Sequence, residues 1–448
     1  MKKQVLLILA VVTSMAIQSQ TINTIAGNGT SGYFGNGGPA INALLDHPNQ
    51  LAFDQAGNLF IAEDYNNVIR KIDVLGNIST VAGDGTAGFG GDGFPAVNAQ
   101  LNRATGVAVD AAGNLYICDG DNFRIRKVDV SGNIHTIAGT GTNGYTGNGF
   151  AATSADIGFS SGICVDAAGN VYFATQGNGS CIRKIDTGGI ISTVAGTGTA
   201  GYNGDNILAV NAQLNAPASV FRDAAGNLYI GEVGGMRVRK VNTSGIITTV
   251  AGNGSTASGG DGAAATSAQL FYPYGVTVDA GGTMYICESG YNRIRKVDAL
   301  GIISTFAGMG GLVGGYGGNG GPALLAQFYH PSAVALDAAG NVFIGDFENS
   351  AIRKITLGSI GIDENFSDNS QGLTVSPNPF SSETVITFSE EQKNTTIKIT
   401  DVLGKEFHSF AFSGKQLTIE KNELKAGIYF LQANDQQNNT INKKIMIQ

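Results

Sequence analysis

The sequence predicts an all-β protein whose main part is a ring of four-stranded sheets. A phrase typified by residues 110–127, DAAGNLYICDGDNFRIRK, recurs six times, and the Ala-Gly pair that ends each copy returns every 56 residues, with one interval of 57. Each copy holds four short β runs, and three of them, such as VAV, LYI and TIA in the second copy, are apolar on consecutive residues, as in strands covered on both faces. A long repeat of this kind forms a supersecondary unit, and the blades of a β-propeller, each packed between two neighbours, fit the pattern.

The second copy illustrates the expected strands. Its four runs cover residues 106–110, 114–118, 124–129 and 133–138. The first two runs are joined by Asp-Ala-Ala-Gly-Asn, where the Asp110 side chain can accept bonds from backbone amides and Gly113 can adopt the left-handed conformation of a tight hairpin. We therefore expect four antiparallel strands in each copy.

These elements resemble the NHL repeat, with its GVAVD strand, its GN-hydrophobic strand, an acidic corner and then Asn-x-Arg-Ile. The resemblance covers about residues 21–356. Because that family places one four-stranded blade in each repeat, it implies a six-bladed β-propeller. Two copies depart from the pattern: Arg222 replaces the apolar residue before Asp223, and Thr175 replaces the acidic corner of the third copy.

The ring is expected to close by exchange of its terminal strands. Six Ala-Gly strands exist, but the first precedes any blade and the last blade ends at residues 352–355 without one. Residues 21–27, TINTIAG, are therefore predicted to supply the outermost strand of the sixth blade, with Ile25 buried. Residues 358–362 begin like the missing strand and then fail to match it.

The segments around the propeller have other compositions. Residues 1–20 carry two lysines, an apolar run and then small residues, which predicts a secretory signal peptide cleaved after Ala16 or Ser19. No other apolar stretch is long enough to cross a bilayer, so no integral span is expected in the mature chain. Residues 357–372 are polar, lack the repeat and predict a linker.

Residues 373–448 form a second unit, in which alternating runs predict a small antiparallel β-sandwich. Four of its phrases resemble the C-terminal sorting domain of the bacterial type IX secretion pathway: SPNPF at 376–380, ITDVLGK at 399–405, KAGIYFL at 425–431 and KKIMI at 443–447. The resemblance implies that this unit engages the type IX machinery. It further implies export across the outer membrane, removal of the tail, and a secreted or cell-surface location.

Charge and glycine patterns exclude two classes of partner. A net charge of −8 and a pI near 5.0 disfavour nucleic acid, whose phosphates require a basic surface. Four glycine phrases match GxGxxG, but no helix is expected after them, so no dinucleotide cofactor is predicted. Cys118 and Cys287 lie on the second strands of the second and fifth copies, and Cys164 and Cys181 lie on the first and third strands of one copy, so all four cysteines are expected to be unpaired.

Seven residues are candidates for a binding face. Five carboxylates begin the loops between the second and third strands: Glu63, Asp119, Glu232, Glu288 and Asp346. They could form a rim for a cation or a polar ligand, or each could cap its turn or pair with a nearby arginine. His47 and His330 occupy equivalent positions in the first and last blades, which closure makes neighbours, but the equivalent residues elsewhere are poor ligands, so no metal is predicted.

The sequence favours a binding or interaction protein with an unknown protein or glycan ligand. No serine, histidine and acid set and no CxxC pair is present to predict a catalytic residue. Two alternatives remain open. One is a lyase or lactonase-like hydrolase with a metal in the central channel, as in some six-bladed relatives. The other is a structural surface protein.

Overall fold

A computed structural model describes residues 20–177, 179–357, 373–376, 378, 380–401, 406–421, 424, 427–434 and 440–447. The chain divides into two compact units, Met1–Leu357 and Gly358–Gln448. The predicted signal peptide up to residue 19, and residues 358–372 of the predicted linker, lie outside the described residues.

The described part of the first unit forms six antiparallel sheets, in keeping with the all-β prediction. The first contains β2 (Pro48–Phe53), β3 (Leu59–Glu63), β4 (Val68–Ile72) and β5 (Ile78–Ala82), and the second contains β6 (Ala104–Val109), β7 (Leu115–Asp119), β8 (Arg124–Val128) and β9 (Ile134–Ala138). The third contains β10 (Phe159–Val165), β11 (Val171–Gln176), β12 (Ser180–Ile185) and β13 (Ile191–Gly198).

The other three sheets repeat this order. The fourth contains β15 (Pro217–Arg222), β16 (Leu228–Glu232), β17 (Arg237–Val241) and β18 (Ile246–Ala251), with β14 (Ile207–Leu208) at its edge. The fifth contains β19 (Pro273–Val278), β20 (Met284–Glu288), β21 (Arg293–Val297) and β22 (Ile303–Ala307). The sixth contains β24 (Pro331–Leu336), β25 (Val342–Asp346), β26 (Ala351–Thr356), β1 (Thr21–Ala26) and β23 (Gly321–Pro322).

The hairpin between the first two strands forms as its sequence predicts. Asp110 Oδ1 accepts hydrogen bonds from the backbone N–H of Ala112 (3.0 Å) and of Asn114 (2.9 Å). Gly113 has φ of +92°, a value that side chains rarely tolerate. The chemistry of the turn therefore fixes the pairing of β6 with β7.

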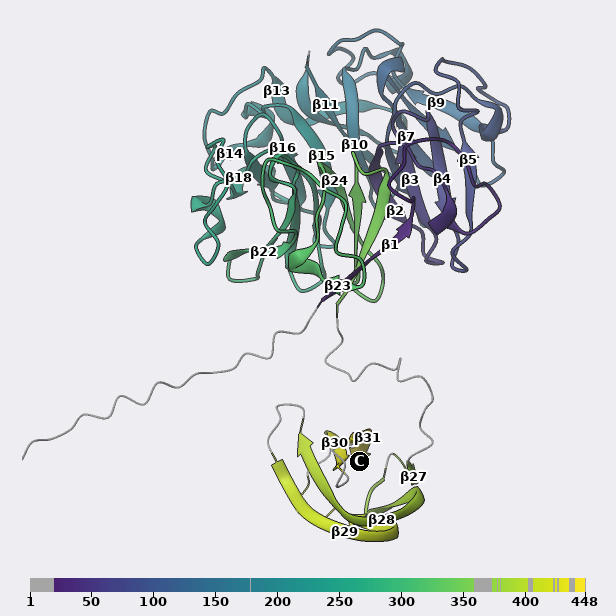
Figure 1. Cartoon of the computed structure of the whole chain (residues 1–448). Coiled ribbons are helices and arrows are strands. Elements are labelled where there is room, and N and C mark those ends of the chain that lie inside the picture. Colours follow the sequence, from purple (N-terminus) through teal and green to yellow (C-terminus); the bar gives the residue numbers. More distant parts are fainter. Residues whose placement is uncertain are drawn as a thin grey trace, which may run out of the picture. The chain divides into compact units, whose positions relative to one another are not determined.

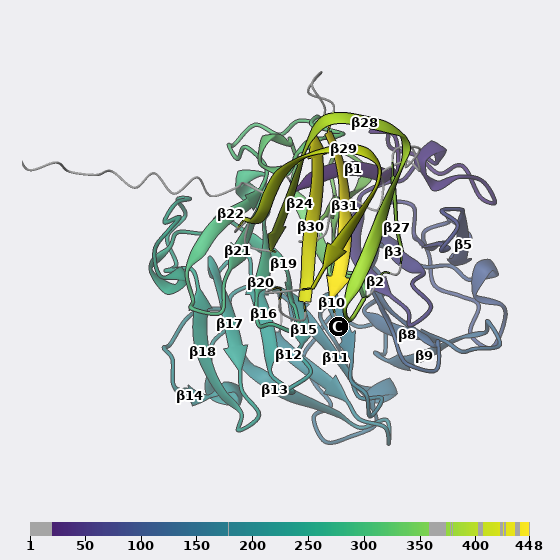
Figure 2. The same cartoon turned by 90° about the horizontal axis from the view of Figure 1, so that it is seen from below.

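The six sheets are arranged around an axis. First strands such as β10, β15 and β24 lie toward the middle of Figure 2, whereas fourth strands such as β9, β13 and β18 lie at the periphery. The first strands contact one another in the order β2, β6, β10, β15, β19, β24 and back to β2. The core lies between adjacent sheets: Phe60 and Ile69 of the first sheet pack in one buried cluster with Val107 and Ile117 of the second. This explains why consecutive residues are apolar.

The predicted exchange of terminal strands is confirmed. β1 pairs with β26, the third strand of the sixth sheet, and with β23, near which it begins in Figure 1. Ile22 is fully buried, whereas Ile25 is only partly buried. The expectation of a buried Ile25 is therefore wrong, because the strand turns Ile22 into the core between the fifth and sixth sheets.

The cysteines and the glycine phrases also follow expectation. All four cysteines are free; Cys118 and Cys287 lie on second strands of different sheets, and Cys164 and Cys181 lie on β10 and β12 with β11 between them. After the glycine phrases the chain forms three-residue 3-10 turns such as Ala40–Asn42. Within the described residues, no helix is long and apolar enough to span a membrane.

The second unit contains β27 (Leu373–Ser376), β28 (Glu383–Asp401), β29 (Glu406–Glu420), β30 (Gly427–Asn434) and β31 (Thr440–Ile447). These strands hydrogen-bond as one sheet. The long β28 pairs with β29 along its length, while β27 and β30 share its other edge. Its buried cluster draws on all five strands, including Phe388 and Leu431, and is separate from the clusters of the first unit.

Candidate functional site at the mouth of the central channel

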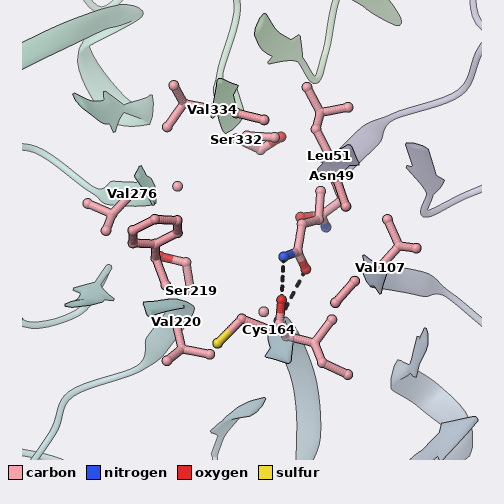
Figure 3. Close-up of a pocket in the computed structure, with 18 of the residues that line it drawn as sticks. Asn49, Leu51, Val107, Cys164, Ser219, Val220, Val276, Ser332 and Val334 are labelled. Atoms are coloured by element: carbon pink, nitrogen blue, oxygen red, sulfur yellow. Dashed lines mark hydrogen bonds between the residues drawn. The ribbon is translucent and has the colours of Figure 1, made fainter. Parts of the chain in front are cut away.

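The first strands of the six sheets line a cavity of about 270 Å³ on the axis (Figure 3). Its wall is mostly apolar, with Leu51, Val107, Val220, Val276 and Val334 among the lining side chains. The polar groups that line it include Asn49, Ser219 and Ser332, together with the thiol of Cys164. An apolar cavity with a few polar groups is the usual form of a small-molecule site.

One side chain bridges this cavity. The Gln50 amide donates from Nε2 to the backbone oxygen of Ile163 (2.8 Å) and accepts from its N–H (3.2 Å), so it joins the first sheet to the third (Figure 3). The edge of β10 that faces the axis has unpaired backbone groups, and the amide satisfies one donor and one acceptor there. The channel is therefore crossed by a side chain at this level.

Hydroxyl groups tie the first strands of neighbouring sheets together near one end of the channel. Each donates to a backbone oxygen of the next first strand: Thr105 to Ser160 (2.6 Å), Ser161 to Ala218 (2.9 Å), Ser219 to Tyr274 (2.5 Å) and Ser332 to Pro48 (2.9 Å). The last of these bonds joins the sixth sheet to the first. The end of the channel is thus held rigidly, which favours a preformed site.

The residues that precede the first strands form the mouth of the channel. His47, Arg103, Ala216, Tyr272 and His330 all have φ between 48° and 57°, which is uncommon for residues other than glycine. Side chains of the preceding sheets hold two of these turns. Asn67 Oδ1 accepts the Arg103 N–H (2.8 Å), and Asn292 Oδ1 accepts the His330 N–H (2.7 Å).

The two predicted histidines lie beside one carboxylate. His47 Nε2 is 3.4 Å from Glu348 Oε2, and His330 Nδ1 is 3.7 Å from Glu348 Oε1. Asp46 Oδ1 lies 2.5 Å from His47 Nδ1. The structure therefore brings together the first and sixth sheets at the mouth. Within the described residues, no group of three or more His, Cys, Asp and Glu side chains is placed to hold a metal ion.

The five predicted carboxylates do not form an exposed rim. Glu63, Asp119, Glu232, Glu288 and Asp346 are fully buried at the ends of their second strands. Each faces the buried arginine of its own sheet, at N–O distances of 2.9 to 3.9 Å. The binding-rim interpretation is thus wrong for these five residues, because a carboxylate seven residues before an arginine meets it across the hairpin.

Burial dominates the electrostatics of these pairs. It raises the pKa of Glu63 to about 7, of Asp119 to about 6, of Glu232 to about 8 and of Asp346 to about 6, although the paired arginine lowers each of them. The raised pKa values have a structural cause and are no sign of catalysis.

A second cavity of about 270 Å³ opens at the mouth, and we call it the mouth cavity. It is lined by Val233, Tyr272, Tyr274, Ser289, His330, Ser332 and Phe347. It shares Tyr274 and Ser332 with the cavity on the axis. The Tyr272 ring is 42% exposed and stacks on Phe271 with centroids 4.3 Å apart. Aromatic surface and a few polar groups therefore converge beside the axis.

Arginine charge at the mouth is already neutralised. Arg103 donates from Nε and Nη2 to the two oxygens of Asp64, both at 2.8 Å, and these bonds raise its pKa. Its guanidinium also lies 5.0 Å from the centroid of the Phe159 ring. The mouth thus offers little free positive charge to an anionic ligand.

Sequence reasoning found His330 but missed Tyr272, Phe347 and Glu348. The signal for Phe347 and Glu348 was present, because both break the repeat. The loop position of Phe347 holds Asp64 and Val233 in other copies. Positions that keep one residue in all copies build the sheet, whereas positions that vary can serve a ligand.

Comparisons of the sequence with known families confirm both resemblances. Residues 374–448 match the secretion system C-terminal sorting domain. Residues 85–146, 141–203 and 253–316 match the teneurin NHL domain.

The chain is 28% identical over 329 residues to Protein SUPPRESSOR OF QUENCHING 1, chloroplastic, of Arabidopsis thaliana, covering 70% of this chain and 30% of that protein. It is 27% identical over 380 residues to human Teneurin-4, covering 75% of this chain and 13% of that protein. The chain thus spans less than a third of these relatives.

Solved structures share the all-β, propeller-like fold. An auxiliary nutrient binding protein from Bacteroides ovatus matches with a TM-score of 0.56 and 17% identity, over 76% of this chain and 77% of that one. A protein of unknown function from Bacteroides thetaiotaomicron matches with a TM-score of 0.55 and 18% identity, over 75% of this chain and 76% of that one. At these identities the likeness concerns the fold alone.

Proposed function

We propose that the chain is an exported six-bladed propeller that binds a small glycan in the mouth cavity. The observation that carries this proposal is the convergence of Tyr272, Phe347 and His330 on one cavity beside the axis. These residues come from the fifth and sixth repeats; Tyr272 and Phe347 differ from their equivalents in the other repeats, and His330 recurs only as His47 of the first repeat. The site is therefore asymmetric, as a specific ligand requires.

The chemistry of the mouth cavity suits a sugar ring. A sugar presents C–H groups on its faces and hydroxyls at its edge, so it can lie against exposed aromatic rings while polar side chains bind the edge. Tyr272 offers such a ring, and His330 offers a nitrogen close to Glu348. Because the Arg103 charge is paired with Asp64, a neutral ligand fits better than an anionic one.

The arrangement of the sheets and the C-terminal unit support a six-bladed ring that is exported from the cell. Six sheets whose first strands contact in cyclic order support a six-bladed ring at residues 21–356. The match of residues 374–448 to a sorting domain supports export through the type IX machinery, after removal of a signal peptide at residues 1–20. We infer that the mature protein is secreted or held at the cell surface. The similar protein from Bacteroides ovatus is an auxiliary nutrient binding protein, which agrees with the proposal, although the proposal itself rests on the cavity.

Binding can be tested with the purified chain. A glycan array should give defined hits, and calorimetry should then show stoichiometric binding that Tyr272→Ala and His330→Ala each weaken at least about tenfold, roughly 1.4 kcal/mol. Phe94→Ala is the matched control, since Phe94 is 67% exposed but contacts the fourth strand β9 at the periphery. An array without hits, or equal weakening by Phe94→Ala, would contradict the proposal.

A further inference from the structure

Six arginines occupy the same buried position in the six sheets. Arg70, Arg126, Arg183, Arg239, Arg295 and Arg353 are all 0% exposed. In five sheets the guanidinium faces the carboxylate that ends the second strand, at 2.9 to 3.9 Å. Pairing is expected, because a buried charge without a counter-charge costs several kcal/mol, roughly 3–5 when a partner is removed. Arg183 of the third sheet is the exception.

The register shows which residue replaces the missing acid. Arg183 pairs with Phe173 as Arg126 pairs with Ile117, so Thr175 occupies the position of Asp119. The Thr175 hydroxyl donates to the backbone oxygen of Gly179 (2.5 Å) and carries no charge. The side chain that would have neutralised Arg183 is therefore absent from the third sheet.

A second acid is missing from the same sheet. In the second, fourth and fifth sheets the arginine also pairs with an aspartate of the long connection: Asp92 (2.7 Å), Asp205 (2.9 Å) and Asp261 (2.5 Å). The third sheet has Asn148 there, and its Oδ1 accepts from Thr193. The first and sixth sheets also have asparagine, but they keep Glu63 and Asp346. Only the third sheet lacks both acids.

Arg183 keeps two contacts. Its Nη2 donates to the backbone oxygen of Thr146 (2.8 Å), and its guanidinium lies 5.0 Å from the Tyr145 ring centroid. Within the described residues, Nη1 of Arg183 has no acceptor. Nη1 of Arg239 also lacks a hydrogen bond, but Asp205 lies 2.9 Å from Nη2 of the same guanidinium and balances its charge. A guanidinium does not lose its proton at physiological pH, so neutralisation must come from another group.

We propose that the third sheet binds a small monovalent anion, such as chloride, against Nη1 of Arg183. The anion would take the place that a carboxylate fills in the other five sheets, and it would complete a buried ion pair. Because the anion replaces one carboxylate, we expect it to be no larger than one atom or one carboxyl group. The site is independent of the mouth cavity, because Arg183 lies on β12 of the third sheet and does not line that cavity.

Stability measured against anion concentration tests this site. Thermal unfolding of the full chain would be followed from about 1 to about 300 mM chloride, at an ionic strength fixed with gluconate, whose anion is too large for the site. Because a ligand of the folded state raises the unfolding midpoint, we expect a rise of roughly 2–4 °C in wild type. Formate in place of chloride tests whether a planar anion also fits. A midpoint that is equal in chloride and in gluconate would overturn the proposal.

Variants test whether the chloride dependence of the unfolding midpoint arises at Arg183. Thr175→Asp restores the carboxylate and should raise the midpoint in gluconate and abolish the chloride dependence; Arg183→Met removes the charge and should also abolish it. Arg126→Met is the matched control, because it removes an arginine that already has Asp119 and Asp92, and it should keep the wild-type dependence. An unchanged chloride dependence in Thr175→Asp would refute the site. Chlorine-35 NMR line broadening by wild type, relieved by bromide, detects binding without any variant, and its absence would also refute it.

Discussion

The buried arginine and its carboxylate join three parts of a sheet, as the second sheet shows. Arg126 reaches Asp119 on the second strand, the backbone oxygen of Gln100 and Asp92 of the long connection. A guanidinium has five donors in a fixed planar arrangement, so one side chain can hold a strand, a loop and a connection together. This explains why the IRK or VRK phrase recurs in every copy although the residues of the loops vary.

Glu232 should make stability depend on pH. It has the longest of the five ion pairs, and burial raises its pKa to about 8 from an ordinary value of 4.5. Between these values the folded state holds a proton that the unfolded state has lost, so stability falls as pH rises through the window. Glu232→Gln does not titrate. We therefore compare the unfolding midpoints of the two proteins at each pH. The difference, variant minus wild type, should increase from pH 5 to pH 8.5.

Glu288→Gln is the matched control for this measurement. Glu288 lies 2.9 Å from both Arg293 and Arg295, so its loss leaves Arg293 without its carboxylate partner and Arg295 with Asp261 alone, and it should destabilise the chain by roughly 3–5 kcal/mol near neutral pH. At pH 8.5 the changes in unfolding midpoint relative to wild type should thus have opposite signs for the two variants, with the negative change in Glu288→Gln. Parallel midpoints for Glu232→Gln and wild type across the pH range would show that Glu232 is not the titrating group.

Residue roles were less predictable from the sequence than strands were. The sequence located all five carboxylates and offered pairing with arginine as an alternative to a binding rim, but only the structure shows that Glu63, two residues along β3 from the residue opposite Arg70, reaches its guanidinium. Glu348 was not predicted, because it breaks the repeat whereas the predicted carboxylates recur. The departure at Thr175 was visible in the sequence; its consequence depends on Asn148, which lies on a distant loop.

At the level of elements, β1 completes the sixth sheet with the register of the other sheets. Thr24 pairs with Arg353 and Ala26 with Ile352, across a one-residue bulge. The second sheet has the same arrangement, with Thr136 opposite Arg126 and Ala138 opposite Ile125. The N-terminal strand thus occupies the position that a fourth strand holds elsewhere. The sequence permitted this prediction because its TIAG phrase is itself a copy of the fourth-strand phrase.

Ile22 should anchor this strand. It is fully buried and packs in a cluster with Val342, Ile344 and Ile355 of the sixth sheet. Ile22→Ala should therefore destabilise the first unit by about 2–5 kcal/mol in denaturant unfolding. Ile25→Ala, the control on the same strand, should cost less because Ile25 is only partly buried. Equal losses for the two variants would mean that the strand is held by its backbone pairing and not by Ile22.

The sequence located strands of the second unit but did not predict how they pair. Alternation identified strands near 385–388, 396–399 and 427–431, all of which lie within β28 or β30. It could not reveal that β28 runs through 19 residues and serves two sets of partners. Alternation in the sequence indicates on which face of a sheet a residue lies. The layering of the strands depends in addition on where a long strand bends.

For the whole molecule, the decisive fact is that each unit has its own core. The buried cluster of the second unit contains residues 373–447 alone, and the clusters of the first unit contain residues up to Leu357. Removal of the tail exposes no apolar core of the ring, because burial within each unit is self-contained.

We therefore expect the exported protein to end before about Ser376 and to keep the unfolding midpoint of the ring. Intact-mass spectrometry of secreted material, and thermal unfolding of that material beside the full chain, measure both expectations. A chain truncated at residue 372 by a stop codon is the control, since it should fold but remain inside the cell. Secreted protein that carries the whole tail would contradict the sorting role of residues 373–448.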